Sequence, residues 1–225
     1  MNITFYGHAS FGIEVNGKHI LVDPFITANS QAAHIDINLL KADYILVTHA
    51  HQDHVLDVDV IAKRTGAVII SNYEIVNHFM AKELNGHHLN HGGTFTCDAF
   101  SAKYVNAIHT SSFADGSYGG EPGGFVFTTN NKSVYIAGDT CAHYDMKLIP
   151  MMHKLDAAIL PIGDTFTMGV DEAIIASDFV ECDRVVGCHF NTFPPIQIDT
   201  EKAIEKFASK SKELILLDIG ASIEI

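Results

Sequence analysis

A short segment at residues 49–54 holds four side chains that can bind a metal ion, since it reads His-Ala-His-Gln-Asp-His. In an extended chain His49 and His51 point to the same side. A turn after them would bring Asp53 and His54 to a neighbouring point. By chance, such a window is expected in on the order of a few in a thousand chains of this histidine content. The segment therefore predicts a site that could serve two adjacent metal ions.

Imidazole and carboxylate ligands suit zinc, manganese, iron, nickel and cobalt alike. The segment contains no cysteine, so its ligands alone leave the metal open. We expect two divalent metal ions, with zinc as the first candidate. The alternative is a group of surface histidines without a role. It is disfavoured because the segment directly follows the apolar run at 44–47, and polar residues at the end of a buried strand usually serve function.

The first half of the chain begins with β-rich runs and then alternates strands with helices. Strands are predicted at 3–6, 11–15, 19–22, 44–47 and 67–71, and helices at 57–64 and 73–84. Asn16-Gly17 predicts a tight hairpin turn between two of the early strands. The segment 86–91, Gly-His-His-Leu-Asn-His, is predicted to be a solvated loop, because histidine-rich composition alone is weak evidence for metal binding.

The second half repeats this plan. Strands are predicted within 94–110 and at 123–129, 133–137, 157–161, 184–187, 214–217 and 221–225, and helices at 143–153, 171–182 and 200–211. A turn at Asn130-Asn131 joins two of the strands. Two halves of this kind predict two mixed sheets face to face with helices outside both, an α/β (α+β) four-layer αββα sandwich. The length predicts a single domain over residues 1–225.

The chain carries 14 basic and 27 acidic residues, a formal charge of −13. Such a charge repels polyanions, because proteins bind nucleic acid by neutralising phosphates with Lys and Arg. We therefore expect a small-molecule substrate and no nucleic-acid partner. Bound cations would make the local field positive, which leaves a small anionic substrate open.

The chain start lacks the basic and apolar pattern of a secretory signal, and no apolar stretch approaches membrane-spanning length. The four cysteines form no C-x-x-C pair, which is typical of reduced core thiols. We expect a cytoplasmic protein without a membrane partner, and a homo-oligomer is left open.

The segment 49–54 resembles the H-x-H-x-D-H loop of the metallo-β-lactamase superfamily, and the resemblance covers essentially the whole chain. Further motifs follow in the expected order: Gly-His-Ala-Ser-Phe at 7–11, Leu-Val-Asp-Pro at 21–24, Gly-Asp-Thr at 138–140, Pro-Ile-Gly at 161–163, Phe-Thr-Met at 166–168 and His-Phe-Asn-Thr-Phe-Pro at 189–194. The resemblance points to the small, stand-alone metal-dependent hydrolases of the superfamily, similar to the ascorbate-phosphate lactonase group. It implies a metallo-β-lactamase-like fold.

The resemblance also implies the ligands of a dinuclear centre. They would be His49, His51 and His109 for the first metal, Asp53, His54 and His189 for the second, and Asp139 as a bridge. His109, Asp139 and His189 each follow a predicted strand, where a sheet delivers ligands to an edge crevice. Several true β-lactamases bind their second zinc through a cysteine at the position of Asp139, so an antibiotic-hydrolysing role is not expected.

Four further residues are candidates near the metals. Asp23 would accept a hydrogen bond from a ligand histidine and fix its tautomer, or would form a plain turn with Pro24. His8 would face the site, where its imidazole could steady a substrate oxygen or protonate a leaving group; the alternative is a structural histidine. Asn191 and Thr192 are predicted to line the pocket.

Together these residues predict a metal-dependent hydrolase in which metal-bound hydroxide attacks an ester-like substrate, such as a lactone or thioester, or a phosphodiester. Asp53 would orient the hydroxide and take its proton, so Asp53 and His8 are the catalytic candidates. One alternative is a di-iron oxidoreductase, which usually carries an added flavin domain for which 225 residues leave no room. The others are an RNA-processing nuclease of the same fold and a non-catalytic metal-binding protein.

Overall fold

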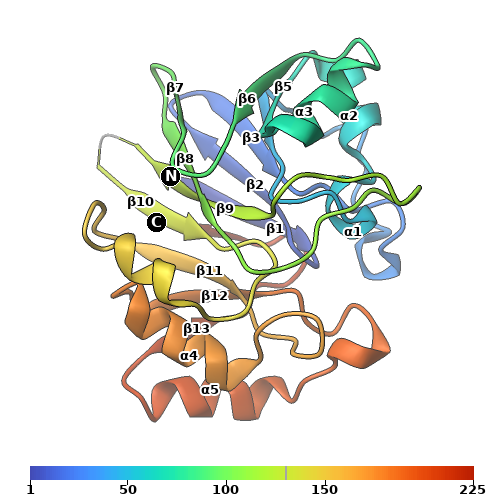
Figure 1. Cartoon of the computed structure of the whole chain (residues 1–225). Coiled ribbons are helices and arrows are strands. Elements are labelled where there is room, and N and C mark those ends of the chain that lie inside the picture. Colours follow the sequence, from blue (N-terminus) through green and yellow to red (C-terminus); the bar gives the residue numbers. More distant parts are fainter. Residues whose placement is uncertain (130) are drawn as a thin grey trace.

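Two seven-stranded sheets form the centre of the molecule (Figure 1), and the computed structural model describes residues 1–129 and 131–225. In spatial order, the first sheet contains β14 (Ser222–Glu224), β1 (Asn2–Gly7), β2 (Ser10–Val15), β3 (Lys18–Val22), β4 (Tyr44–Leu46), β5 (Val68–Asn72) and β6 (Gly86–Leu89). The second contains β13 (Glu213–Ile215), β12 (Arg184–Cys188), β11 (Ala157–Pro161), β10 (Ser133–Ile136), β9 (Gly123–Thr128), β8 (Ser101–Asn106) and β7 (Thr94–Thr96).

Each sheet is half antiparallel and half parallel. In the first sheet the pairs from β14 to β3 are antiparallel, and those from β3 to β6 are parallel. In the second sheet the pairs from β7 to β10 are antiparallel, and those from β10 to β13 are parallel. Parallel neighbours require crossover connections, which place helices on the outer faces.

The helices cover the outer faces of both sheets. On the first sheet lie α2 (Val58–Thr65) and α3 (Tyr73–Met80), and on the second lie α4 (Val170–Phe179), α5 (Thr200–Ala208) and the 3₁₀ helix η2 (Tyr144–Leu148). The short elements α1 (Gln52–Val55), η1 (Ser30–Ala32) and η3 (Pro194–Ile196) lie within connections. The predicted αββα sandwich with two mixed sheets is confirmed. Within the described ranges, no helix combines the length and apolarity needed to cross a bilayer.

Three apolar clusters correspond to the three interfaces between these layers. The central cluster draws on both sheets and includes Ile70 from β5 and Phe127 from β9, both fully buried. The other two lie between a sheet and its helices. Because the buried parallel strands are apolar on both faces, each sheet contributes to two clusters at once.

Two sequence predictions are wrong in detail. The segment 86–91 is not a loop throughout, because Gly86–Leu89 pairs in parallel with β5 as β6. The missing side chain of Gly86 permits this, since a Cβ there would lie 2.4 Å from Val76 Cγ1. The helix predicted at 143–153 is only the short η2, because Pro150 lacks the N–H and crowds the preceding turn of an α-helix.

The hairpin turn between β2 and β3 is confirmed. Asn16 and Gly17 have φ values of 49° and 74°, the pair of positive angles that a type I′ turn requires. The turn predicted at Asn130-Asn131 lies partly outside the described residues, since residue 130 is not among them.

Truncating one side chain of the central cluster tests the packing of the two sheets. Phe127→Ala removes a fully buried ring, and we expect the free energy of unfolding to fall by about 3–5 kcal/mol. Leu39→Ala is the control, because Leu39 is 78% exposed and its loss should change stability by no more than about 0.5 kcal/mol. Urea denaturation followed by circular dichroism measures both, and equal midpoints would contradict the assigned packing.

Candidate metal centre

The seven predicted ligands meet at one edge of the sandwich, where four strands end. Their positions along the chain are as follows: His49 and His51 after β4, Asp53 and His54 in α1, His109 after β8, Asp139 after β10 and His189 after β12. The first sheet thus supplies one contiguous segment, and the second sheet supplies three separate residues.

His49, His51 and His109 form one group. Their ligand atoms all lie within 4.8 Å of one another. The Nε2 atom of His49 lies 3.1 Å from Nδ1 of His51, so the two ring nitrogens face the same point. Three imidazole nitrogens converging in this way are a common protein ligand set for one divalent cation.

Asp53, His54 and His189 form the second group, and His8 joins them within the same 4.8 Å limit. Asp53 Oδ2 lies 3.8 Å from His189 Nε2 and 4.0 Å from His54 Nε2. The two groups contain the residues that the sequence resemblance assigned to two separate metals, with His8 in addition.

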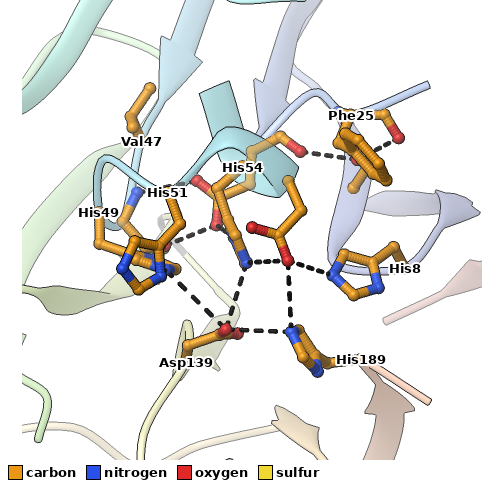
Figure 2. Close-up of polar contacts among 12 residues, drawn as sticks. His8, Phe25, Val47, His49, His51, His54, Asp139 and His189 are labelled. Carbon is orange, nitrogen blue, oxygen red and sulfur yellow. Dashed lines mark hydrogen bonds and ion pairs between the residues drawn. The ribbon is translucent and has the colours of Figure 1, made fainter. Parts of the chain in front are cut away.

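Asp139 lies between the groups, and Figure 2 shows its carboxylate facing the surrounding imidazoles. Its Oδ2 atom is 3.0 Å from His189 Nε2 and 3.3 Å from His54 Nε2. It is also 3.6 Å from His109 Nε2 and 3.8 Å from His49 Nε2. This single carboxylate therefore reaches both groups, which is the position that a bridging ligand needs.

A buried network behind the centre orients two of the histidines. Asp23 Oδ2 lies 2.8 Å from His54 Nδ1 and accepts a 2.6 Å hydrogen bond from the Thr48 hydroxyl. Because that hydroxyl has donated its only proton to Asp23, its oxygen accepts from His49 Nδ1 at 3.0 Å. Both histidines then carry their free lone pair on Nε2, which faces Asp139.

His8 faces the site from the turn between β1 and β2. Its Nε2 lies 3.1 Å from Asp53 Oδ2, and its Nδ1 lies 3.0 Å from Thr192 Oγ1. The rings of Phe25 and Phe193 pack against the imidazole at centroid distances of 5.6 and 5.3 Å, and the His189 ring lies 4.1 Å from it. The imidazole is therefore packed among three rings and has its polar edges directed at Asp53 and Thr192.

Burial and the neighbouring groups together determine which residues of the centre are ionised. Burial raises the pKa of Asp139, but His189 and His54 lower it more, to well below its usual range. Burial likewise opposes ionisation of Asp53, but the neighbouring imidazoles of His189, His54 and His8 hold its pKa below the usual value. Burial lowers the pKa of His8 to about 4, so this imidazole is neutral near pH 7. The centre thus combines ionised carboxylates with at least one neutral histidine.

The chemistry of this donor set fits divalent cations. His54 Nε2 and Asp139 Oδ1 are buried, and neither has a hydrogen-bond partner among the described residues. Buried polar atoms are rarely left unpaired, because each loses its hydration without compensation. A cation in each group would satisfy these atoms and would balance the buried negative charge.

Several residues of the site have strained backbone conformations. His8, Asp23 and His189 have φ values of 56°, 44° and 52°, in the left-handed region where each non-glycine residue costs about 1–3 kcal/mol. The surrounding packing maintains them: the His189 N–H donates to the His8 carbonyl at 2.8 Å and so joins the two sheets. Gly163 also approaches closely, since a Cβ there would lie 2.1 Å from the His189 carbonyl oxygen.

The structure brings all seven predicted ligands together with His8, Asp23 and Thr192. Asn191 differs from the prediction, because its Oδ1 accepts from the Ile198 N–H at 2.7 Å and stabilises its own loop. Sequence reasoning missed Thr48. Its only signal in the sequence is its place between the apolar run and the first histidine.

Comparison with known proteins gives related sequences and structures. The family model described as "Beta-lactamase superfamily domain" matches residues 2–189. A protein named UPF0173 metal-dependent hydrolase from Flavobacterium johnsoniae is 64% identical over 225 residues, and the match covers all of both chains. A protein of the same name from Christiangramia forsetii is 60% identical over 226 residues and is also covered completely.

Among solved structures, the chain is similar to Igni18, a metallo hydrolase from the archaeon Ignicoccus hospitalis. The TM-score is 0.87 and the sequence identity is 30%, and the match covers 100% of this chain and 98% of that chain. The similarity therefore extends over both sheets and over every strand end that carries a residue of the centre.

Removing the central carboxylate tests the metal centre. Asp139→Asn keeps the shape but removes the charge that reaches both groups, and we expect the affinity for zinc or manganese to fall by about tenfold or more. Elemental analysis of protein dialysed against graded metal concentrations measures this loss. Asp171→Asn is the control, since Asp171 is paired with Lys206 away from the centre. Equal metal content in the two variants would rule out the central role of Asp139.

The Thr48 hydroxyl can be tested separately. Thr48→Val replaces a fully buried side chain with one of nearly equal shape but breaks the link between Asp23 and His49. We expect metal affinity to drop about tenfold, because partners that orient metal ligands typically contribute that much. Thr48→Ser retains the hydroxyl and should bind metal like the unmodified chain. If valine and serine behave alike, the hydroxyl does not orient His49.

Proposed function

Because the chain belongs to the β-lactamase superfamily and, within it, to the UPF0173 metal-dependent hydrolases, we propose that it hydrolyses an ester-like or phosphodiester small molecule at a centre of two divalent metal ions. The protein is a metal-dependent hydrolase of the metallo-β-lactamase fold.

The observation that supports two metals is the division of the ligands into two groups around one carboxylate. His49, His51 and His109 would hold one cation. Asp53, His54 and His189 would hold the other, with Asp139 in contact with both. Cations bound there act as Lewis acids on a substrate oxygen and lower the pKa of water.

Asp53 is the residue best placed to handle protons. Its side chain is 29% exposed, whereas that of Asp139 is only 3% exposed, so an incoming substrate and its water can reach it. Its low pKa keeps the carboxylate ionised, so that Oδ2 can accept a hydrogen bond from the attacking water and orient it. We assign Asp53 this orienting role.

His8 holds Asp53 in place and provides a second site for a proton. Its Nε2 lies 3.1 Å from Asp53 Oδ2, while Thr192 fixes the opposite ring nitrogen. The neutral imidazole can give its Nε2 proton to the leaving group, and the freed Nε2 can then take the proton that the Asp53 carboxylate has received from the water. The aromatic walls of Phe25 and Phe193 restrict the ring to this orientation.

The surroundings of the centre favour a small substrate of low charge. Within the described ranges, no Lys or Arg forms a hydrogen bond or ion pair with any residue of the two groups. The whole chain has a formal charge of −13. Polyanion binding depends on such basic contacts, so we propose a lactone, thioester or single phosphodiester rather than RNA.

Assays of Asp53 and His8 variants on lactone, thioester and phosphodiester panels test the proposed roles. We expect His8→Asn to lower kcat by about 10²- to 10⁴-fold on the preferred substrate while metal content stays unchanged, because His8 handles protons without being required as a ligand. Asp53→Asn should lower kcat at least as much, and it should also weaken metal binding.

His88→Asn is the matched control, because His88 lies in β6 and its ring contacts Asn77. It should retain full activity. Unchanged rates for both Asp53→Asn and His8→Asn, measured on fully metal-loaded protein, would refute the proposed mechanism. Absence of turnover on all three substrate classes by the unmodified, metal-loaded protein would refute the proposed substrate range.

A further inference from the structure

The outer surface around η2 carries a concentration of exposed apolar side chains. Of the thirteen large apolar residues that are exposed in the described part of the chain, four lie between positions 144 and 152: Tyr144, Leu148, Met151 and Met152. Tyr144 is 77% and Met151 is 80% exposed. Single exposed apolar residues are normal, but a contiguous group marks an interaction site.

This group continues onto α4. The Tyr144 ring stacks on Phe179 at a centroid distance of 5.5 Å, and Lys147 Nζ lies 4.5 Å from the Phe179 centroid. We call the surface formed by Tyr144, Lys147, Leu148, Met151, Met152 and Phe179 the η2 face. It lies beside α4, on the side of the molecule away from α1 and the metal centre (Figure 1). Aromatic residues and methionine are the types enriched at the cores of protein interfaces.

A groove of about 550 Å³ adjoins the η2 face, and the charged residues of its lining are one base and two acids, of which Asp178 is paired with Lys212. Its lining includes Lys147, Met151 and Glu181. Neither Lys147 nor Glu181 forms an ion pair with any residue that the structure describes, although both line the same groove. Each charge is therefore available to a partner.

We propose that the η2 face joins two copies of this chain around a two-fold axis, with Lys147 of each copy paired with Glu181 of the other. A two-fold contact places the same surface on itself, so each apolar side chain meets an apolar counterpart. The same symmetry brings the unpaired cation and anion together twice. This interface goes beyond the hydrolytic function and does not depend on it.

The charge of the chain supports a second copy as the occupant. Two copies with a formal charge of −13 each repel one another over most of their surfaces, so contact requires a locally compensated face. The η2 face supplies this through the unpaired Lys147 and Glu181, while Asp178, the other acidic residue of the groove, is already paired with Lys212. Reciprocal pairs of this kind fix the orientation of a complex more than they add affinity.

The test is the molar mass of the full-length protein, measured by light scattering and sedimentation over a range of concentrations. We expect the unmodified chain to be dimeric. Met151→Asp and Lys147→Glu should each raise the dissociation constant of the dimer by about tenfold or more, because the first places a charge in the apolar part of the contact and the second puts a carboxylate opposite Glu181 of the other copy. Glu181→Lys should act in the same way.

The double variant Lys147→Glu with Glu181→Lys should recover dimerisation, because the reciprocal pairs form again with reversed signs. Leu39→Asp is the control for an exposed apolar residue elsewhere and should leave the dimer intact. Circular dichroism verifies that each variant is folded, and Tyr144→Ser replaces any that is not. A monomeric unmodified chain, a dimer that Met151→Asp does not weaken, or a double variant weaker than both single ones would overturn the proposal.

Discussion

The burial of ionised carboxylates among imidazoles is the constraint on which the rest of the site depends. Asp139 has only 3% of its side chain exposed, yet its pKa lies well below the usual range. An ionised carboxylate buried in this way needs positive charges or hydrogen-bond donors next to it, because it has lost its hydration. The imidazoles around it supply part of this compensation, and divalent cations held among them would supply the rest. The ends of β4, β8, β10 and β12 lie together at one edge of the sandwich, and this arrangement holds the carboxylates and imidazoles close to one another.

The two sheets deliver different parts of the centre and must therefore be held in a fixed relation. The backbone hydrogen bond from His189 to His8 joins them directly at the site. The hydroxyl of Tyr104, from the second sheet, donates to the carbonyl of Thr48 at 2.8 Å and so adds a second link. Because Thr48 also orients His49, the contacts that join the two sheets also fix the orientation of a ligand. The strained backbone angles at His8, Asp23 and His189 are maintained because several contacts of this network hold each of these residues.

The opposite, outer surface of the second sheet has a different character. At the metal centre polar atoms are buried and apolar groups serve as walls, whereas at the η2 face large apolar side chains are exposed around a single basic residue. The two regions lie on different elements and face different directions (Figure 1). A two-fold contact through the η2 face would therefore leave the centre of each copy accessible to a small substrate.

Much of this protein was determined by local sequence. The H-x-H-x-D-H segment, the apolar strands and the helices have short-range patterns, and these predicted the layers and the four candidate ligands of residues 49–54, whereas His109, Asp139 and His189 were implied by the family resemblance. The local pattern failed at β6, which exists because its backbone pairs with the distant β5. The helix predicted at 143–153 was wrong for a local reason, since Pro150 interrupts it. The assignment of His109 and His189 to different groups followed from resemblance, not spacing. The roles of Thr48 and His8 were decided by tertiary structure, because a hydrogen bond between residues tens of positions apart depends on sheet register and backbone angles that no local pattern encodes.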